Sequence, residues 1–378
     1  MKCGVAVVAM NSTDWDRVNA GDWSRPPAIP DHQILDDAIA VGDLVEPLGF
    51  DSLWSSEHFA TPYGMVPSSL QFLAFWAGRT KKIDLGSLVV VLPWWHPVKV
   101  AHEIAMLDIL LQGRNFTLGV GRGLSPKEFG PLGVPQEESR QRFNEALEVI
   151  KRGFAEERFS YDGEVFKIPE MSIRPQPRHR DLASRAVGAF MTPASLEAIA
   201  KAGLGHIVVT AASFDQVGRN TALFNKHRQD VGLPPDNQPI LYLFCYCSED
   251  RAELEAAKRF AALPDGNYHY GFSDPSTFTN VKGYEAYGHM AAARAGPGAG
   301  DGDAAAYQWL LGTPDEMIEK CRALQRHTSA KEIVLAFNYG GMTQAQAIAS
   351  MRLFAEKVLP ALHAMETPIH HEALAPVA

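Results

Sequence analysis

The stretch IDLGSLVVVLPWWHPVKVAHEIAMLDILLQGRNFTLGVG, residues 83–121, joins two apolar runs through a helical pattern. The first run, 83–92, and the last, 116–121, are apolar at successive positions, so both faces of each strand are expected to be buried. Strands of this kind occur in parallel sheets that helices cover on both faces. The stretch therefore predicts a strand–helix–strand unit of an α/β protein.

Similar apolar runs recur along the 378 residues and alternate with helical patterns, of which 34–49, 138–154 and 248–263 are examples. Eight runs are predicted to be strands: 5–10, 51–56, 83–92, 116–121, 184–190, 206–211, 239–247 and 332–337. Eight strands, each followed by a helix, fit a single closed (β/α)8 barrel of the TIM type. A doubly wound sheet is the alternative, although it commonly divides a chain of this length into two domains.

Two insertions interrupt the alternation, one after the fourth strand and one after the seventh. Residues 157–180 have the pattern of a small hairpin followed by a proline-rich crossing segment. Residues 264–311 contain PDGNYHYGFSDPSTF and then AAARAGPGAGDGDAAAY, and this second segment, rich in Gly and Ala, is expected to bury little apolar surface and to be mobile. Because loops after barrel strands lie on the catalytic face, about 264–311 is predicted to be a mobile lid on a barrel domain, 1–365, with a C-terminal tail, 366–378. A disordered insertion without a role is the alternative.

The composition excludes several classes of function. Hydrophobic residues make up 46% and charged residues 21%, the balance of a soluble globular protein. A net charge of −9 argues against nucleic acid or an acidic membrane surface as a partner. The opening MKCGVAVVAMNSTDWD is apolar but short, which favours a buried strand over a signal peptide or a membrane span. None of the four cysteines forms a CxxC pair, so neither a zinc site nor disulfides are expected, and a reducing cytoplasm is the expected location.

Three glycines and one arginine end the fourth strand, in the order Gly119, Gly121, Arg122 and Gly123. The third glycine comes one residue too early for a dinucleotide fingerprint, and the Gly-Lys-Ser/Thr of a P-loop is absent. A tight strand-to-helix turn is one explanation. An anion site is the other, because glycine lets the backbone approach a ligand and Arg122 offers a planar donor set that matches phosphate.

Several motifs together resemble those of the bacterial luciferase-like flavin monooxygenases. The likeness is closest in GSLVVVLPWWHPVKVAHEIAMLDILLQGRNFTLGVGRGL (86–124) and EFGPLGVPQEESR (128–140), and it extends to SLWSSEHF (52–59) and GTPDEMIEKCRAL (312–324). The family has Ser where this chain has Leu111, a difference expected to be structural. The resemblance implies a single TIM-type barrel that binds reduced flavin at the C-terminal ends of its strands.

The resemblance also assigns residues to a flavin phosphate site. Arg122 and the backbone near Leu124 would contact the phosphate. Met191, Thr192 and Ser195 at the start of a helix would supply the other half, since a helix N-terminus binds phosphate through free N–H groups. Thr192 is also an N-cap candidate, and the two roles are compatible.

Further positions carry over to the flavin ring and to the chemistry. Leu88 and Val89 stand where the family often has a non-proline cis peptide against the ring, and Gly121 replaces the reactive thiol of luciferase. By resemblance His58 matches a catalytic histidine, and imidazole exchanges a proton near neutral pH. A hydrogen-bonded packing histidine is the alternative. For the adjacent Glu57 a structural role is favoured.

Four aromatic residues are candidates for a substrate pocket: Phe59, Tyr63, Trp94 and Trp95. The two indoles stand where luciferase relatives often carry smaller residues, which indicates a bulky apolar or aromatic substrate. Plain packing, or a contact with a partner subunit, is the alternative.

The resemblance implies a flavin-dependent, two-component monooxygenase. A separate NAD(P)H:flavin reductase would supply reduced FMN, which would react with O2 to give a C4a-peroxyflavin and insert one oxygen atom into a small apolar substrate. A homodimer through helices near 60–115 is expected, and no metal site, because HEIAM (102–106) lacks the second His of a zinc motif. Alternatives are an F420-dependent oxidoreductase of the same fold, a non-catalytic flavin-binding relative, and a barrel hydrolase that uses Glu57 with a second carboxylate.

Overall fold

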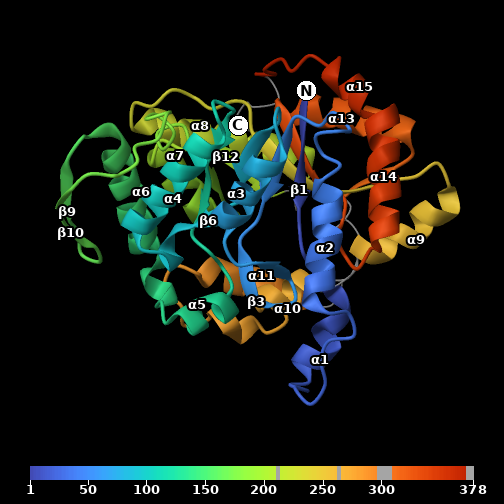
Figure 1. The fold of residues 1–378 in the computed structure, drawn as a ribbon, viewed down its shortest axis with the longest axis horizontal. Helices are drawn as coiled ribbons and strands as arrows, with labels where there is room; N and C mark the ends of the chain where they lie inside the picture. The colour runs from blue at the N-terminus through green and yellow to red at the C-terminus, as the bar shows by residue number, and fades with distance from the viewer. Residues whose placement is uncertain (210–212, 262–264, 296–308, 372–378) are drawn as a thin grey trace. The chain divides into compact units, whose positions relative to one another are not determined.

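The computed structural model describes residues 1–209, 213–261, 265–295 and 309–371 (Figure 1). The chain folds into two compact units. Unit 1 comprises residues 1–54, 188–263 and 301–378, and unit 2 comprises 55–187 and 264–300.

Unit 1 contains a parallel sheet and the helices that accompany it. Its strands are β1 (Lys2–Val7), β2 (Ser52–Ser55), β11 (Val187–Ala189), β12 (Gly205–Val209), β13 (Ile240–Cys247), β14 (Trp309–Gly312) and β15 (Glu332–Ala336), two of which reach one residue past the boundary. Its helices are η1 (Ser12–Asp14), α1 (Trp15–Asn19), α2 (Asp31–Gly42), α7 (Pro193–Lys201), α8 (Phe214–Asp230), α9 (Arg251–Ala261), α13 (Pro314–Thr328), α14 (Gln344–Lys357) and α15 (Leu359–His363).

The strand order in unit 1 is β11-β12-β13-β15-β1-β2, and β14 also pairs with β13. The pairing of β13 with β12, β14 and β15 is parallel, as is that of β1 with β15. All eight residues of β13 are buried, which explains why ILYLFCYC is apolar throughout and does not alternate with polar residues. The four cysteines of the chain are buried and free, as expected.

Unit 2 contains the remaining elements. Its strands are β3 (His58–Thr61), β4 (Gly64–Val66), β5 (Asp84–Ser87), β6 (Val90–Val91), β7 (Phe116–Thr117), β8 (Gly119–Gly121), β9 (Phe159–Asp162) and β10 (Lys167–Met171). Its helices are α3 (Ser69–Arg79), η2 (Leu92–Trp94), α4 (Pro97–Leu110), α5 (Pro126–Leu132), η3 (Gln136–Glu138), α6 (Ser139–Ala155), α10 (Asp265–Tyr270), η4 (Pro275–Phe278) and α11 (Glu285–Ala295).

Two interrupted strands run side by side in unit 2. The first consists of β5 and β6, the second of β7 and β8, and the pairs β5–β7 and β6–β8 are parallel. A Cβ on Gly119 would collide with the carbonyl oxygen of Ser87, and one on Gly121 would lie 2.5 Å from Cγ2 of Val89. Both glycines therefore let the two strands approach each other, a reason that the sequence interpretation did not include.

All eight predicted strand positions hold strands, and the hairpin predicted within 157–180 is the antiparallel pair β9–β10. Leu111, which ends α4, is fully buried, in keeping with a structural role. The β3–β4 hairpin and β14 were not predicted. Within the described part of the chain, no helix has the length and apolar character needed to cross a membrane.

The insertion at 264–311 is partly described. Residues 265–295 form α10, η4 and α11, and a buried cluster, here called the Tyr284 cluster, forms on them: Leu124, Phe272, Phe278, Tyr284, Tyr287 and Ala291. The Gly-rich part, 296–308, lies outside the described residues. The first half of the insertion therefore buries substantial apolar surface, and the domain limits and the lid stay predictions.

Candidate active site

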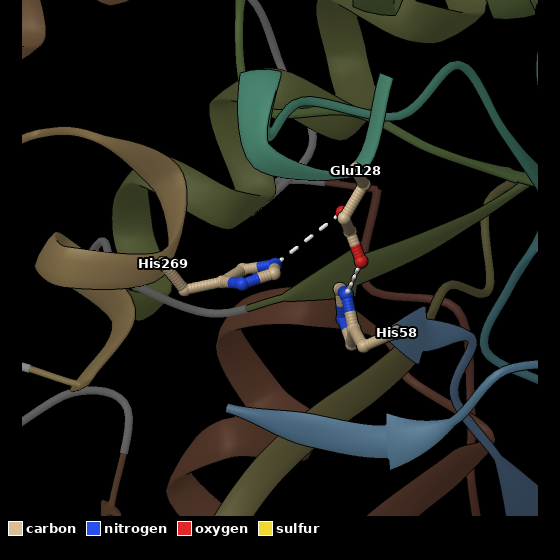
Figure 2. A group of neighbouring side chains, drawn as sticks. All are labelled: His58, Glu128 and His269. Atoms are coloured by element: carbon tan, nitrogen blue, oxygen red, sulfur yellow. Dashed lines mark hydrogen bonds and ion pairs between the residues drawn. The ribbon is translucent and has the colours of Figure 1, made fainter. Parts of the chain in front are cut away.

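His58 and Glu128 form a hydrogen-bonded pair in unit 2. His58 Nδ1 lies 3.0 Å from Oε1 of Glu128, and the backbone N–H of Phe59 donates to the same oxygen at 3.2 Å. Figure 2 shows the Glu128 carboxylate between the rings of His58 and His269. The His58 side chain is 19% exposed and that of Glu128 is 1% exposed. One ring nitrogen of His58 is thus held by a buried carboxylate, while its other nitrogen is available to a ligand.

The short β3–β4 hairpin positions His58. The pairing of β3 with β4 shifts register between His58 and Thr61, and between them Ala60 adopts a φ of +63°. Such a bulge reorients side chains, and here both His58 and Thr61 reach the cluster around Glu128. Opposite them, a Cβ on Gly64 would lie 2.5 Å from the His58 Cβ, so only glycine leaves room for the histidine.

Glu128 does not have the local role that its spacing predicts. Ser125 is the N-cap of α5 and Glu128 stands three residues later, the pattern of a capping box. The structure has no side-chain cap here, because Ser125 Oγ donates to the carbonyl oxygen of His269 at 2.6 Å and Glu128 points to His58. A local rule left unsatisfied in this way is typical of a functional site.

His269, on α10 of the insertion, is the third member of the group. Its Nε2 lies 3.3 Å from Oε2 of Glu128, its Nδ1 lies 2.7 Å from Oγ1 of Thr61, and the residue is fully buried. The ring of Tyr63 stacks on it with centroids 4.5 Å apart. The sequence interpretation missed both His269 and Glu128, and the Ser125-x-x-Glu128 pattern by itself predicts only a helix cap.

The surroundings of these groups set their charges. Burial lowers the pKa of His269 to about 4, against the opposing effect of Glu128, so the ring is neutral at pH 7. Burial by itself would raise the pKa of Glu128, but the charge of His58 and the hydrogen bonds from His269 and His58 outweigh it and hold that pKa at about 2. The carboxylate is therefore ionised and can stabilise a proton that arrives on His58.

The same three side chains have the composition of a metal site. One donor atom from each of His58, Glu128 and His269 lies within 4.8 Å of the others. Two imidazoles and a carboxylate can hold a divalent transition metal. The hydrogen bond between His58 Nδ1 and Glu128 explains why these two side chains lie close together without a metal ion.

Three of the four predicted pocket residues lie together in a cluster next to the pair, here called the Trp94 cluster: Phe59, Val89, Val91, Trp94, Trp95, Phe129, Leu132 and Val134. The ring of Trp94 contacts those of Phe59 and Phe129 edge-on, with centroids 5.1 and 5.9 Å apart. Phe59 and Phe129 are the chain neighbours of His58 and Glu128, so the apolar cluster adjoins the polar one. Tyr63 belongs to the other group, around His269.

Glu57 and the Leu88–Val89 peptide adjoin the Trp94 cluster, to which Val89 itself belongs. The Leu88–Val89 peptide is cis, as the resemblance implies, and both side chains are half-buried. Glu57 is buried and accepts from the backbone N–H of Val91 at 2.7 Å. Burial raises the pKa of Glu57 to about 8, although bonds from Val91 and Trp95 oppose the shift. Glu57 thus holds β6 in place, which is the structural role expected of it.

Arg122 lies against the insertion. Its guanidinium stacks on the ring of Tyr284, 4.0 Å from the centroid, and Nη2 donates to the carbonyl oxygen of Gly283 at 3.0 Å. The Tyr284 hydroxyl donates to the carbonyl oxygen of Gly123 at 2.9 Å. The Leu124 side chain packs in the Tyr284 cluster. The insertion therefore fixes the guanidinium and leaves other N–H donors of Arg122 for a ligand.

A second arginine, which the sequence interpretation did not select, accompanies Arg122. Arg140 lies in the first turn of α6 and is half-buried, and burial, followed by the charge of Arg122, lowers the pKa of its guanidinium. The charge of Arg122 disfavours that of Arg140 at this half-buried position, and an anion bound close to Arg140 would stabilise its charged form. A phosphate, which accepts several charged hydrogen bonds, suits this pair of guanidinium groups.

The other predicted phosphate residues belong to unit 1. Thr192 is the N-cap of α7, where its Oγ1 accepts from the backbone N–H of Ser195 at 3.3 Å. Both side chains are buried, and Met191 before them is 37% exposed. The N-cap role of Thr192 is confirmed, and the phosphate role of this helix start stays a prediction.

Comparisons with known proteins identify relatives of the chain. The family model described as luciferase-like monooxygenase matches residues 19–330. The alkanal monooxygenase alpha chain of the Kryptophanaron alfredi symbiont is 26% identical over 89% of this chain and 96% of its own length. The oxygenase component of the flavin-dependent trigonelline monooxygenase of Acinetobacter baylyi is 31% identical over 38% of this chain and 40% of its own length.

Solved structures agree with these matches. The crystal structure of monooxygenase RslO1 from Streptomyces bottropensis aligns with a TM-score of 0.73 and 27% identity over 97% of this chain and all of that one. This likeness confirms the predicted α/β fold class of the TIM-barrel type.

Two structures under 20% identical show the fold alone. The oxygenating constituent of 3,6-diketocamphane monooxygenase from Pseudomonas putida, in complex with FMN, has a TM-score of 0.71 and 19% identity, covering 95% of this chain and 98% of that one. An F420-dependent secondary alcohol dehydrogenase has a TM-score of 0.69 and 17% identity, covering 96% of this chain and 98% of that one.

Proposed function

The chain belongs to the luciferase-like monooxygenase family, and from this premise we propose that it inserts one oxygen atom of O2 into an apolar organic substrate with reduced FMN. The observation that carries the proposal is the pair of His58 with the buried Glu128 carboxylate beside the Trp94 cluster. A base that is partly exposed, paired with a buried charge and next to apolar rings, suits proton transfer beside an apolar substrate.

The arginine pair supports a flavin nucleotide. Arg122 and Arg140 provide a half-buried dication in the described part of unit 2, and FMN ends in a dianionic phosphate. Met191, Thr192 and Ser195 are proposed to add helix N-terminal donors to the same phosphate. Leu88, Val89 and Gly121 are proposed to lie against the ring, since Leu88 and Val89, between β5 and β6, are apolar and half-buried, and Gly121 carries no side chain. When bound, reduced FMN supplies the electrons that activate O2.

The protein's own groups then have separate tasks. His58 donates from Nδ1 to Glu128, so Nε2 is the nitrogen that accepts a proton from the reacting groups and later returns it. Glu128, which is ionised, stabilises the imidazolium that forms. Phe59, Trp94 and Trp95 would exclude water and contact the apolar substrate, and Tyr63 would confine the ring of His269 beside them.

The proposal includes partners. A separate NAD(P)H:flavin reductase would supply the reduced FMN, in keeping with the named oxygenase component among the relatives. A homodimer is proposed through α3 and α4, where Phe75, Met106 and Leu110 are exposed apolar side chains at 39%, 49% and 39%. Exposed apolar side chains on neighbouring helices favour contact with a second copy.

The experiment is a single turnover with product analysis. Protein loaded anaerobically with chemically reduced FMN is mixed with O2 and a panel of long-chain aldehydes, cyclic ketones and aromatic compounds, and products are identified by mass spectrometry with ¹⁸O2. One ¹⁸O atom in a product supports the proposal. His58→Ala should slow oxygenation about 100-fold with the fold intact, because it removes the general base; Glu128→Gln should have a smaller effect in the same direction.

Two controls separate the alternatives. Loading with F420 and testing hydride transfer to a ketone examines the F420 alternative, and turnover with F420 but not with FMN would exclude the proposed cofactor. FMN that binds yet yields neither product nor O2 consumption across the panel would favour a non-catalytic flavin-binding protein. An undiminished product yield from His58→Ala would remove the assigned role of the histidine.

A further inference from the structure

We propose that His269 is a positioning residue for His58, through which helix α10 of the insertion must be seated before His58 can act as a base. The inference rests in part on the proposed function, since it concerns the same base. His269 does not reach the exposed side of His58; it acts on the Glu128 carboxylate from the opposite side.

The charge of Glu128 indicates where the proton of His269 lies. Oγ1 of Thr61 accepts from the backbone N–H of Tyr63 at 3.3 Å and lies 2.7 Å from Nδ1 of His269, to which it can donate or from which it can accept. The ionised carboxylate 3.3 Å from Nε2 disfavours a lone pair on that nitrogen, so we assign the proton of the neutral ring to Nε2 and the Thr61 proton to Nδ1. A neutral ring that accepts at Nδ1 carries its proton on Nε2, and Nε2 faces Oε2 of Glu128.

The two oxygens of Glu128 are thus shared between two histidines. Oε1 accepts from His58 and from the backbone N–H of Phe59, and Oε2 lies 3.3 Å from Nε2 of His269, a contact that does not meet the geometry of a regular hydrogen bond. Rotation of the carboxylate would nevertheless take Oε1 away from His58 or Oε2 away from His269. His58 is consequently held with its proton on Nδ1 and with Nε2 ready to accept.

The surroundings leave this role to His269. The other titratable groups that act on the cluster are Lys127 on α5 and the buried Glu57, whose raised pKa of about 8 leaves it mostly neutral at pH 7. The aromatic rings of Tyr63 and Tyr270 contact the imidazole. The side-chain contact that the structure records for Oε2 of Glu128 is the one with Nε2 of His269. Removal of His269 would leave one oxygen of a buried carboxylate unsatisfied, which favours its protonation or its rotation away from His58.

The insertion is connected to the base by these contacts. His269 lies within α10, and its carbonyl oxygen accepts from Ser125 of α5, the helix that carries Glu128. Displacement of α10 would break the contacts of both the ring and the backbone with this part of the site. The carboxylate that orients His58 would then lose the contact that α10 provides.

The test is ¹⁵N NMR of the full chain labelled on histidine, without flavin, together with single-turnover kinetics. The wild-type protein should show His58 as the Nδ1–H tautomer. His269→Phe keeps an aromatic ring that can stack on Tyr63 but removes the N–H donor. His58 should then become a mixture of tautomers. The kcat should fall roughly tenfold, which corresponds to the loss of about one hydrogen bond to a charged group, and KM should not change. His269→Gln retains a donor and should restore both readouts in part.

Three outcomes would overturn the inference: an unchanged His58 tautomer in His269→Phe, a change in KM and melting temperature without one in the tautomer, or stoichiometric Zn²⁺ binding to the wild type that His269→Gln abolishes, which would make the cluster a metal centre. If His269→Phe does not fold, Thr61→Val tests the same chain of bonds by removing the hydroxyl donor. Since the tautomer is read without flavin, a tautomer change without any oxygenation would refute the proposed function and leave the positioning role standing.

Discussion

Replacing Arg122 by alanine should weaken FMN binding and leave riboflavin binding unaltered. In the structure Arg122 uses one N–H for the carbonyl oxygen of Gly283 and stacks on Tyr284, so the guanidinium is held in place before any ligand arrives. Hydrogen bonds to a charged group contribute about 1.5–3 kcal/mol. With each 1.4 kcal/mol corresponding to a factor of ten, the dissociation constant for reduced FMN should rise roughly 12- to 150-fold.

The assay is an anaerobic calorimetric titration of the protein with reduced FMN and, separately, with reduced riboflavin. Riboflavin lacks the phosphate, so its affinity reports on every contact except those to the phosphate. Arg140→Ala should act in the same direction as Arg122→Ala, and the double variant should lose less than the sum, because both groups contact one anion. Arg142→Ala is the matched control, since that residue lies on the same helix and pairs with Glu138 near the surface.

Two results would contradict the reasoning. An FMN affinity that Arg122→Ala leaves unchanged would remove the arginine from the site. An equal loss for FMN and riboflavin would mean that the substitution acts through the packing of Tyr284 instead of through the phosphate.

The other predictions concern stability, pH and association. Gly119→Ala should destabilise the protein by about 3 kcal/mol in urea unfolding, because the new Cβ meets a backbone oxygen. The control, Gly78→Ala on the open face of α3, should stabilise the protein by about 0.5–1 kcal/mol. Equal effects of the two substitutions would show that β8 does not pack as described. Because the pKa of His269 is depressed, the unfolded chain binds more protons than the folded one between about pH 6.5 and 4. The free energy of unfolding should therefore fall by roughly 3 kcal/mol as the pH falls through this range, and His269→Gln should reduce that loss. Acid-unfolding curves of the wild type and the variant that run parallel would argue against a neutral buried ring. Met106→Glu should convert the proposed dimer to monomers in light scattering, and a wild-type monomer would refute that dimer.

The parts of this protein that were accessible from its sequence are local in origin. Strand positions follow from runs such as 239–247, because a residue buried on either face of a parallel strand must be apolar, and this requirement acts on successive residues. His58 and Arg122 were selected as candidates through motifs of contiguous residues, and their roles stay proposals. Leu88–Val89 was likewise indicated by a motif, and its peptide is cis.

The tertiary structure alone decided how the site is composed. Residues 58, 128 and 269 come from a hairpin, a short helix and an insertion helix, and no spacing in the chain encodes their meeting. Glu128 had a local explanation as a capping residue, and only packing shows that its carboxylate serves His58 instead of its own helix. Arg140 was an ordinary charged residue of an amphipathic helix until its half-buried position beside Arg122 appeared. The physical reason is that backbone periodicity acts between near neighbours, whereas the charge and proton position of a buried group depend on whichever distant segments exclude water around it.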